Sequence, residues 1–146
     1  MIKQLTKAEL FDSMVHHLDR LSPYIITEID KIENLSLFQK TLQSLETYAI
    51  LEDIESPKTL FDFLKKHQKE LVIIRDDIFL KRKNYLEIVQ GAVCSSPDSM
   101  ALWTVYYLNE RVFVFKGKII LCTNKSKQEI KADKKWEYFA RDCHFI

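Results

Sequence analysis

The sequence has few of the residues that several specialised classes of protein require. Its 146 residues include two glycines, three prolines and three cysteines, and no apolar run approaches the ~20 residues of a membrane span. Two glycines exclude collagen-like and glycine-rich linker chains. They also exclude the glycine-rich loops that hold nucleotide phosphates and the Gly-x-Ser-x-Gly turn of many hydrolases. At 47% hydrophobic and 29% charged, the chain is typical of one folded domain, which we place over residues 1–146.

The cysteine content and the N-terminal segment both predict a cytoplasmic protein. Cys94, Cys122 and Cys143 are an odd number for the paired framework of a secreted domain. Residues 1–15 contain no apolar run of the kind that a signal peptide needs. The cysteines are too far apart for Cys-x-x-Cys zinc ligation, and the four histidines give no pair at chelating spacing. We therefore expect free thiols, no metal, no cofactor and no contact with a membrane.

The first half of the chain predicts four helices. Apolar residues recur there every three to four positions, which indicates one buried face for each helix. Ile25, Ile26, Ile29 and Ile32 form one such series, between the first and third helices. Each helix has a start signal, either a capping box or a capping serine before a first-turn proline. The four starts are Thr6 with Glu9, Ser22 with Pro23, Ser36 with Gln39, and Ser56 with Pro57.

The second half changes to a strand pattern. Between Met100 and Cys122, apolar and aromatic residues alternate in three runs, which polar turns at 109–110 and 116–117 separate. This pattern predicts a three-stranded antiparallel meander, and the β-branched run 85–93 predicts a further strand. Residues 71–80 and 136–146 fit either a helix or a strand. The predicted fold is therefore α+β, with N-terminal helices packed on a C-terminal antiparallel sheet, the meander.

Two local acidic clusters are the candidates for acid–base chemistry. Asp76–Asp77 is one, and Glu52, Asp53 and Glu55 form the other. Burial of paired carboxylates can raise one pKa into a useful range. Both clusters lie where we expect an element to end, which favours a solvated or partner-binding role. Cys94 follows a predicted strand, but no histidine stands near it in sequence to activate the thiol, and we assign no catalytic residue.

Lysines and aromatic residues are interleaved between residues 125 and 139. Lysines neutralise phosphates and aromatic rings stack on bases, so this segment keeps a nucleic-acid-binding accessory protein as an alternative. Glu129 and Asp133 dilute its charge, which favours a solvated connection and disfavours nucleic acid as the partner. The residues concerned are Lys125, Lys127, Lys131, Lys134, Lys135, Trp136, Tyr138 and Phe139.

Residues 101–121 carry a pattern that suggests a family. Trp103 is followed by Tyr106 and Tyr107, a polar turn, the alternating run 112–115, a second polar turn and an Ile/Leu run. In this order the segment resembles a hairpin of the small immunity proteins of bacterial contact-dependent growth-inhibition systems. The resemblance implies a protein without catalytic activity. It implies a cognate toxin domain as the partner, which such proteins bind and block, commonly at a nuclease active site.

Charge is distributed unequally along the chain, in a way that suits binding. Residues 1–70 have a net charge of −3 and residues 71–146 have +4, within a total of +1. If the toxin domain is a cationic nuclease, the acidic half should face it, because complementary fields speed encounter. The predicted partner-binding residues are Glu28, Asp30, Glu33, Glu46, Glu52, Asp53 and Glu55.

An enzyme is the alternative from a different class. A small α+β protein with the cone shape of helices on a curved sheet would use a carboxylate or histidine in a deep pocket. Our first interpretation is an immunity protein that binds and neutralises a bacterial toxin and breaks no covalent bonds. The sequence leaves its oligomeric state open.

Overall fold

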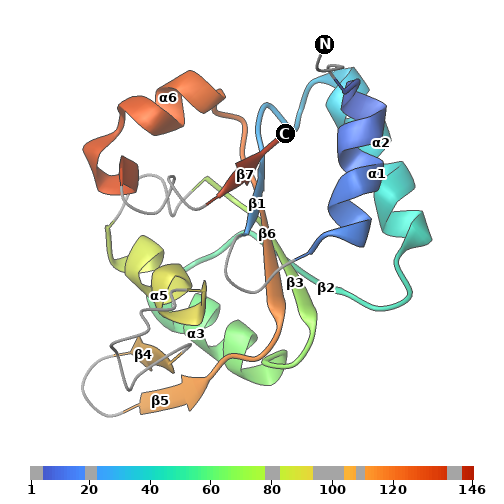
Figure 1. The fold of residues 1–146 in the computed structure, drawn as a ribbon. Helices are drawn as coiled ribbons and strands as arrows, with labels where there is room; N and C mark the ends of the chain where they lie inside the picture. Colours follow the sequence, from blue (N-terminus) through green and yellow to red (C-terminus); the bar gives the residue numbers. More distant parts are fainter. Residues whose placement is uncertain (1–4, 19–22, 78–82, 94–103, 108–110, 138–142) are drawn as a thin grey trace.

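A five-stranded parallel sheet forms the centre of the molecule (Figure 1). The computed structural model describes residues 5–18, 23–77, 83–93, 104–107, 111–137 and 143–146. The strands are β1 Tyr24–Ile26, β2 Ala49–Glu52, β3 Leu71–Arg75, β6 Lys118–Cys122 and β7 His144–Phe145. They lie in the order β2-β3-β6-β1-β7, and every neighbouring pair is parallel. All five strands therefore end at the same edge of the sheet, which we call the carboxyl edge.

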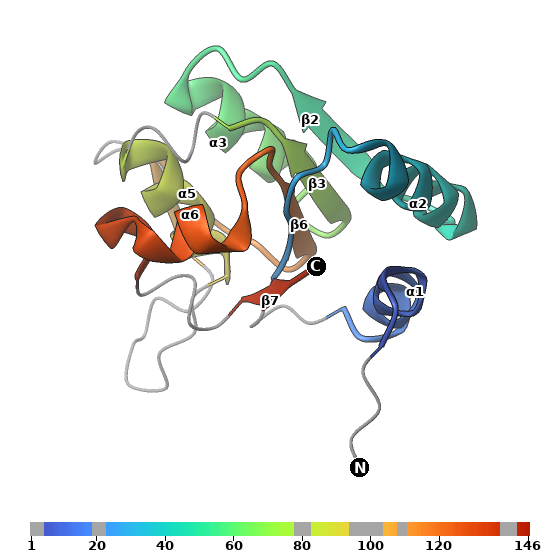
Figure 2. The ribbon, with the colours of Figure 1, turned by 90° about the horizontal axis from the view of Figure 1, so that it is seen from above.

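Helices cover both faces of this sheet (Figure 2). On one face lie α1 (Lys7–His16) and α2 (Ile32–Ser44). On the other lie α3 (Pro57–Lys66), α5 (Lys83–Val93) and α6 (Lys127–Ala132), with a 3₁₀ turn at Lys134–Trp136. Parallel strands covered in this way are buried on both sides, which explains why β3 is almost continuously apolar.

Two of the predicted helix starts are confirmed. Thr6 and Glu9 form the capping box of α1, in which the Glu9 amide donates to Thr6 Oγ1 over 3.2 Å. Ser56 caps α3 by accepting a hydrogen bond from the Thr59 amide. Pro57 fills the first turn of α3, where its missing N–H removes no helical hydrogen bond.

The other assignments in the predicted helical half need correction. Of the series predicted as the second helix, Ile25 and Ile26 belong to β1, where they point to opposite faces of the sheet and are both buried, and Ile32 is the first residue of α2. The predicted start of that helix at Ser22 lies outside the described residues. The third predicted helix begins at Ile32 and not after Ser36. Strand β2 follows it and was not predicted. The run 85–93, predicted as a strand, is helix α5, and it buries residues at helical spacing.

The predicted antiparallel meander is wrong, and the predicted fold class fails with it. β4 (Thr104–Tyr107) and β5 (Arg111–Val114) form an antiparallel hairpin, but β6 leaves it and lies between β3 and β1. The turn predicted at 109–110 lies outside the described residues. The physical reason for the error is burial, because Ile119, Ile120 and Leu121 are each at most 1% exposed. A strand whose consecutive residues are buried needs cover on both faces, which a meander on one layer of helices does not provide.

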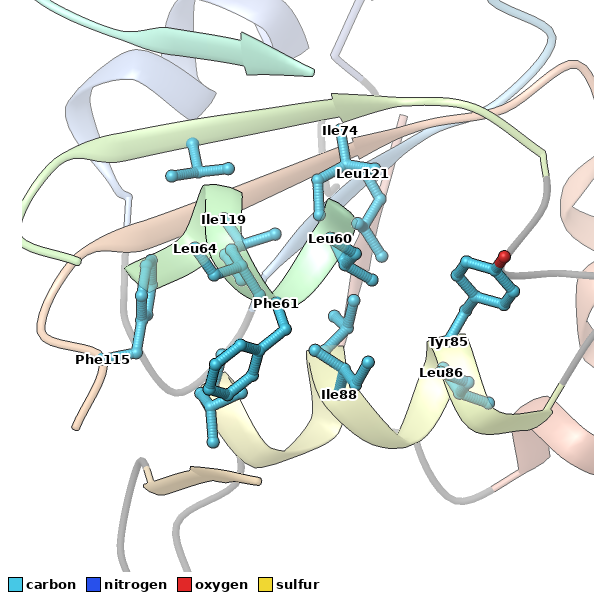
Figure 3. Close-up of a cluster of buried hydrophobic side chains, with 14 of the residues drawn as sticks. Leu60, Phe61, Leu64, Ile74, Tyr85, Leu86, Ile88, Phe115, Ile119 and Leu121 are labelled. Carbon is cyan, nitrogen blue, oxygen red and sulfur yellow. The ribbon is translucent and has the colours of Figure 1, made fainter. Parts of the chain in front are cut away.

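The larger of the two hydrophobic clusters lies between the sheet and the α3–α5 layer (Figure 3). Leu60 and Leu64 of α3 face Ile119 and Leu121 of β6 in this layer. A second cluster lies between the sheet and α1 with α2. Because side chains pack against both faces of β3 and β6, the positions of the strand ends are well fixed.

Candidate functional site

An open hollow of about 320 Å³ lies at the carboxyl edge, which Figure 2 views from above. Its lining comes from the residues at or directly after the ends of β1, β2, β3 and β6. These residues are Ile29, Asp30, Glu52, Asp53, Arg75, Asp76, Asp77, Cys122, Thr123 and Asn124. The parallel order of the strands is what brings these four distant segments of the chain together.

The hollow adjoins the point where the winding of the chain changes direction. After β1 the chain passes to α2 on one face of the sheet, and after the neighbouring β6 it passes to α6 on the other face. Open parallel sheets bind ligands in the crevice at such a point. The two loops are joined by backbone hydrogen bonds, from Ile29 N to Thr123 O at 3.0 Å and from Glu28 N to Lys125 O at 3.1 Å.

Carboxylates dominate the charge of the hollow. Arg75 is the cationic residue among the described lining residues, against five carboxylates. Its guanidinium lies 3.3 Å from Asp30 Oδ1 and 3.9 Å from Glu52 Oε1, so it bridges the ends of β1 and β2. One cation among five acidic groups leaves a net negative surface, which attracts positively charged groups of a ligand.

Asp76 and Asp77 organise the neighbouring loops. Asp76 Oδ2 accepts a hydrogen bond of 2.7 Å from the Ile54 amide, in the loop after β2. Asp77 Oδ1 accepts from the Thr123 hydroxyl and, at 3.2 Å, from the Asn124 amide, in the loop after β6. These two carboxylates therefore give the hollow its shape as well as part of its charge.

Two residues of this edge have a left-handed backbone. Within the described part of the chain, Glu28 with φ 49° and Asp53 with φ 54° are the non-glycine residues with positive φ. Both stand within two residues of a strand end at the carboxyl edge. Such conformations cost energy for residues that have a Cβ, and they concentrate at functional sites.

Cys122 lines the hollow, but its thiol is not activated. Burial raises the pKa of this thiol to about 12, although the Arg75 charge acts in the opposite direction. A thiol with that pKa stays protonated near neutral pH and is a poor nucleophile. Among the described residues, no group of three His, Cys, Asp or Glu side chains is placed to hold a metal ion.

The structure brings together three of the seven residues predicted to bind a partner. Asp30, Glu52 and Asp53 line the hollow. Glu28 and Glu55 do not line it, but each lies within two residues of a lining residue in the sequence. The remaining two do not join them. Glu33 lies on α2 with a carboxylate oxygen 4.0 Å from Lys7 Nζ. Glu46 lies between the end of α2 and the start of β2, at the opposite edge of the sheet.

Sequence reasoning missed Arg75, Thr123 and Asn124, and it noted Asp76 and Asp77 as an acidic cluster without including them among the seven predicted partner-binding residues. A usable signal was present, because polar residues directly follow two apolar runs that begin at Leu71 and Ile119. Interpreting those runs as parallel buried strands would have placed all five residues at one edge.

Comparisons with known proteins identify no relative of this chain. No model of a known family, no curated protein and no solved structure matches the chain. Among the helices of the described residues, none has the length and apolar character needed to cross a membrane.

Proposed function

We propose that the protein binds a basic protein partner at the acidic hollow, as an immunity protein that blocks a cognate bacterial toxin domain. The observation that supports this is the convergence of five carboxylates, from the ends of β1, β2 and β3, on one open concave surface. An open surface of one charge suits a protrusion of a partner protein that carries lysine or arginine.

The binding site in this proposal depends on the carboxyl edge, and the immunity role depends on the resemblance of residues 101–121. The third run of that segment lies in the parallel sheet as β6, so the resemblance to an aromatic meander does not extend to the fold. The charge pattern is independent of this correction, because Asp30, Glu52 and Asp53 come from the acidic half of the chain.

The test uses the product of the gene that neighbours this one as the candidate toxin domain and binding partner. In the variant Glu52→Lys/Asp53→Lys two carboxylates of the hollow change sign. The matched control Glu46→Lys/Asp62→Lys changes the net charge equally at two exposed positions outside the hollow. We expect the association rate at low salt to fall about tenfold or more in the first variant only, since steering depends on charge near the interface.

A growth assay provides a second readout for the same two variants. Cells that produce the toxin domain should survive with the unchanged protein or the control variant, and should stop growing with Glu52→Lys/Asp53→Lys. Equal association rates for the two variants would remove the acidic hollow as the binding site. Failure of the unchanged protein to bind or protect would remove the immunity function.

A small-molecule site is the second candidate, which the position of the hollow at the change of winding favours. Arg75 and Asn124 offer hydrogen-bond donors beside the carboxylates, as in a site for a small zwitterion such as an amino acid, which carries both an ammonium and a carboxylate group. A panel of polyamines and amino acids would test this by thermal shift. A rise in Tm that Glu52→Gln/Asp53→Asn abolishes would support a small-molecule ligand over a protein partner.

A further inference from the structure

A cationic and aromatic surface lies at the other end of the carboxyl edge, over α6 and β7 (Figure 2). Lys127 and Lys131 are one helical turn apart on α6, and both lean over the ring of Phe145. Their Nζ atoms lie 5.4 and 5.7 Å from the centroid of that ring. A ring face attracts ammonium groups, so Phe145 holds the two charges near each other at the surface.

These charges are not cancelled by the acidic residue of the same helix. Glu129 caps α6 through Ser126 and lies 3.6 Å from Lys125 Nζ, on a different side of the helix from Phe145. Among the described residues, neither Lys127 nor Lys131 has a carboxylate within 4 Å. Both side chains are exposed, and so is that of Lys134, which follows in the 3₁₀ turn. The surface therefore presents three exposed lysines to an anion.

A second aromatic group stands on the opposite face of the same strand. His144 is stacked on Tyr24 with ring centroids 4.9 Å apart and an interplanar angle of 29°. Tyr24 is partly buried, whereas His144 is exposed. β7 is the last strand in the order of the sheet, and among the described strands none pairs with its outer side.

We propose that this α6–β7 surface binds single-stranded nucleic acid. The ammonium groups of Lys127 and Lys131 contact successive phosphates, and a base stacks on the outer face of His144. Single-strand binding sites combine cations that follow the backbone with aromatic rings that accept bases of any sequence. An acidic protein would pair with the lysines but would gain little from the exposed ring of His144. This ring therefore favours nucleic acid over an acidic protein as the partner. This inference does not depend on the proposed function, because it uses none of the residues of the hollow.

The test is fluorescence anisotropy with a labelled 15-nucleotide oligothymidine and the corresponding oligouridine, at several salt concentrations. For the unchanged protein we expect a Kd on the order of micromolar at low salt. The variant Lys127→Ala/Lys131→Ala should lose at least tenfold in affinity, and its log–log salt slope should be shallower by about 1.4, since each single-strand phosphate contact contributes about 0.7. The matched control Lys65→Ala/Lys66→Ala removes two exposed lysines from the last turn of α3 and should bind as the unchanged protein does.

Two further measurements separate the alternatives. His144→Ala should weaken binding about tenfold without changing the salt slope, because stacking releases no counterions. Competition with polyglutamate should be weak if bases contribute, and equal displacement by polyglutamate would point to an acidic protein partner. Absence of binding at low salt, or equal losses in the two double-lysine variants, would overturn the proposal. Glu52→Lys/Asp53→Lys should bind the oligonucleotides as tightly as the unchanged protein does. The nucleic-acid proposal and the toxin-binding proposal can therefore be refuted independently of each other.

Discussion

Gly117 occupies a position at which the backbone of another segment leaves no room for a side chain. A Cβ at this residue would lie 1.9 Å from the carbonyl oxygen of Glu70 and 2.9 Å from the ring of Phe115. The φ of Gly117 is not positive, so the need for glycine is steric and not conformational. The close approach lets the Lys118 amide donate to Glu70 O over 3.2 Å, which sets β6 beside β3 at their first residues.

Gly117→Ala should therefore reduce the free energy of unfolding by about 1–3 kcal/mol, because the added methyl group forces two backbones apart. Urea denaturation measures this change directly. Gly91→Ala is the matched control, since Gly91 lies inside α5 and alanine raises helix propensity there. Equal effects of the two substitutions would show that the contact with Glu70 is not the cause.

At the scale of elements, α6 illustrates how a short helix depends on its ends. Six residues are too few for a helix to be stable from propensity alone. Ser126 and Glu129 supply a capping box, with the Glu129 amide donating to Ser126 Oγ at 3.2 Å and the Ser126 amide donating to Glu129 Oε1 at 3.3 Å. The hydrogen bond from the Ser126 backbone favours the ionised carboxylate and lowers the pKa of Glu129.

The stabilisation from this cap should depend on pH in a defined direction. The pKa of Glu129 is lower in the folded than in the unfolded protein, so its contribution is present above the ordinary pKa of 4.5 and is lost as the pH falls through the lowered value. Glu129→Gln keeps a capping side chain that does not titrate. The difference in urea midpoint between the unchanged protein and Glu129→Gln should therefore shrink as the pH is lowered from neutral to about 3. A difference that stays constant or grows as the pH falls would contradict this role of the cap.

Local signals in the sequence predicted two of the elements that local chemistry determines, but the capping box that starts α6 was missed. The capping residues Thr6 and Ser56 identified α1 and α3, because a cap acts within four residues of the chain. The prediction missed strand β1 because Ile25, Ile26, Ile29 and Ile32 have helical spacing. Burial on both faces of the sheet also hides the alternation that is typical of a strand. Whether β6 pairs with the hairpin or with β3 is decided by contacts between distant residues, which no local pattern contains.

The sequence predicted which kind of residue forms the candidate site, but not where in the fold these residues meet. The sequence indicated that Asp30, Glu52 and Asp53 belong to an acidic, partner-binding set. Their convergence with Asp76 and Asp77 depends on the parallel order of the strands, and an antiparallel sheet would have sent these ends to different edges.

For the whole molecule, β3 and β6 form the most protected part. Both are interior strands with packed helices on each face, and Val72, Ile74 and Leu121 are fully buried. In hydrogen–deuterium exchange, the amides of these strands should be the slowest and should exchange through global unfolding. The β4–β5 hairpin lies outside the sheet and should exchange faster. Equal protection of the hairpin would mean that it unfolds together with the sheet.

The place of β1 in the strand order affects how the chain reaches its native state. β1 lies between β6 and β7, and the Thr27 amide and hydroxyl both donate to Ile146 O, across 119 positions of sequence. Ile25 and Ile26 therefore have no sheet partner until the last quarter of the chain has been synthesised. Such long-range pairing gives a high contact order, and we infer slow folding with an early strand that is exposed to aggregation on the ribosome.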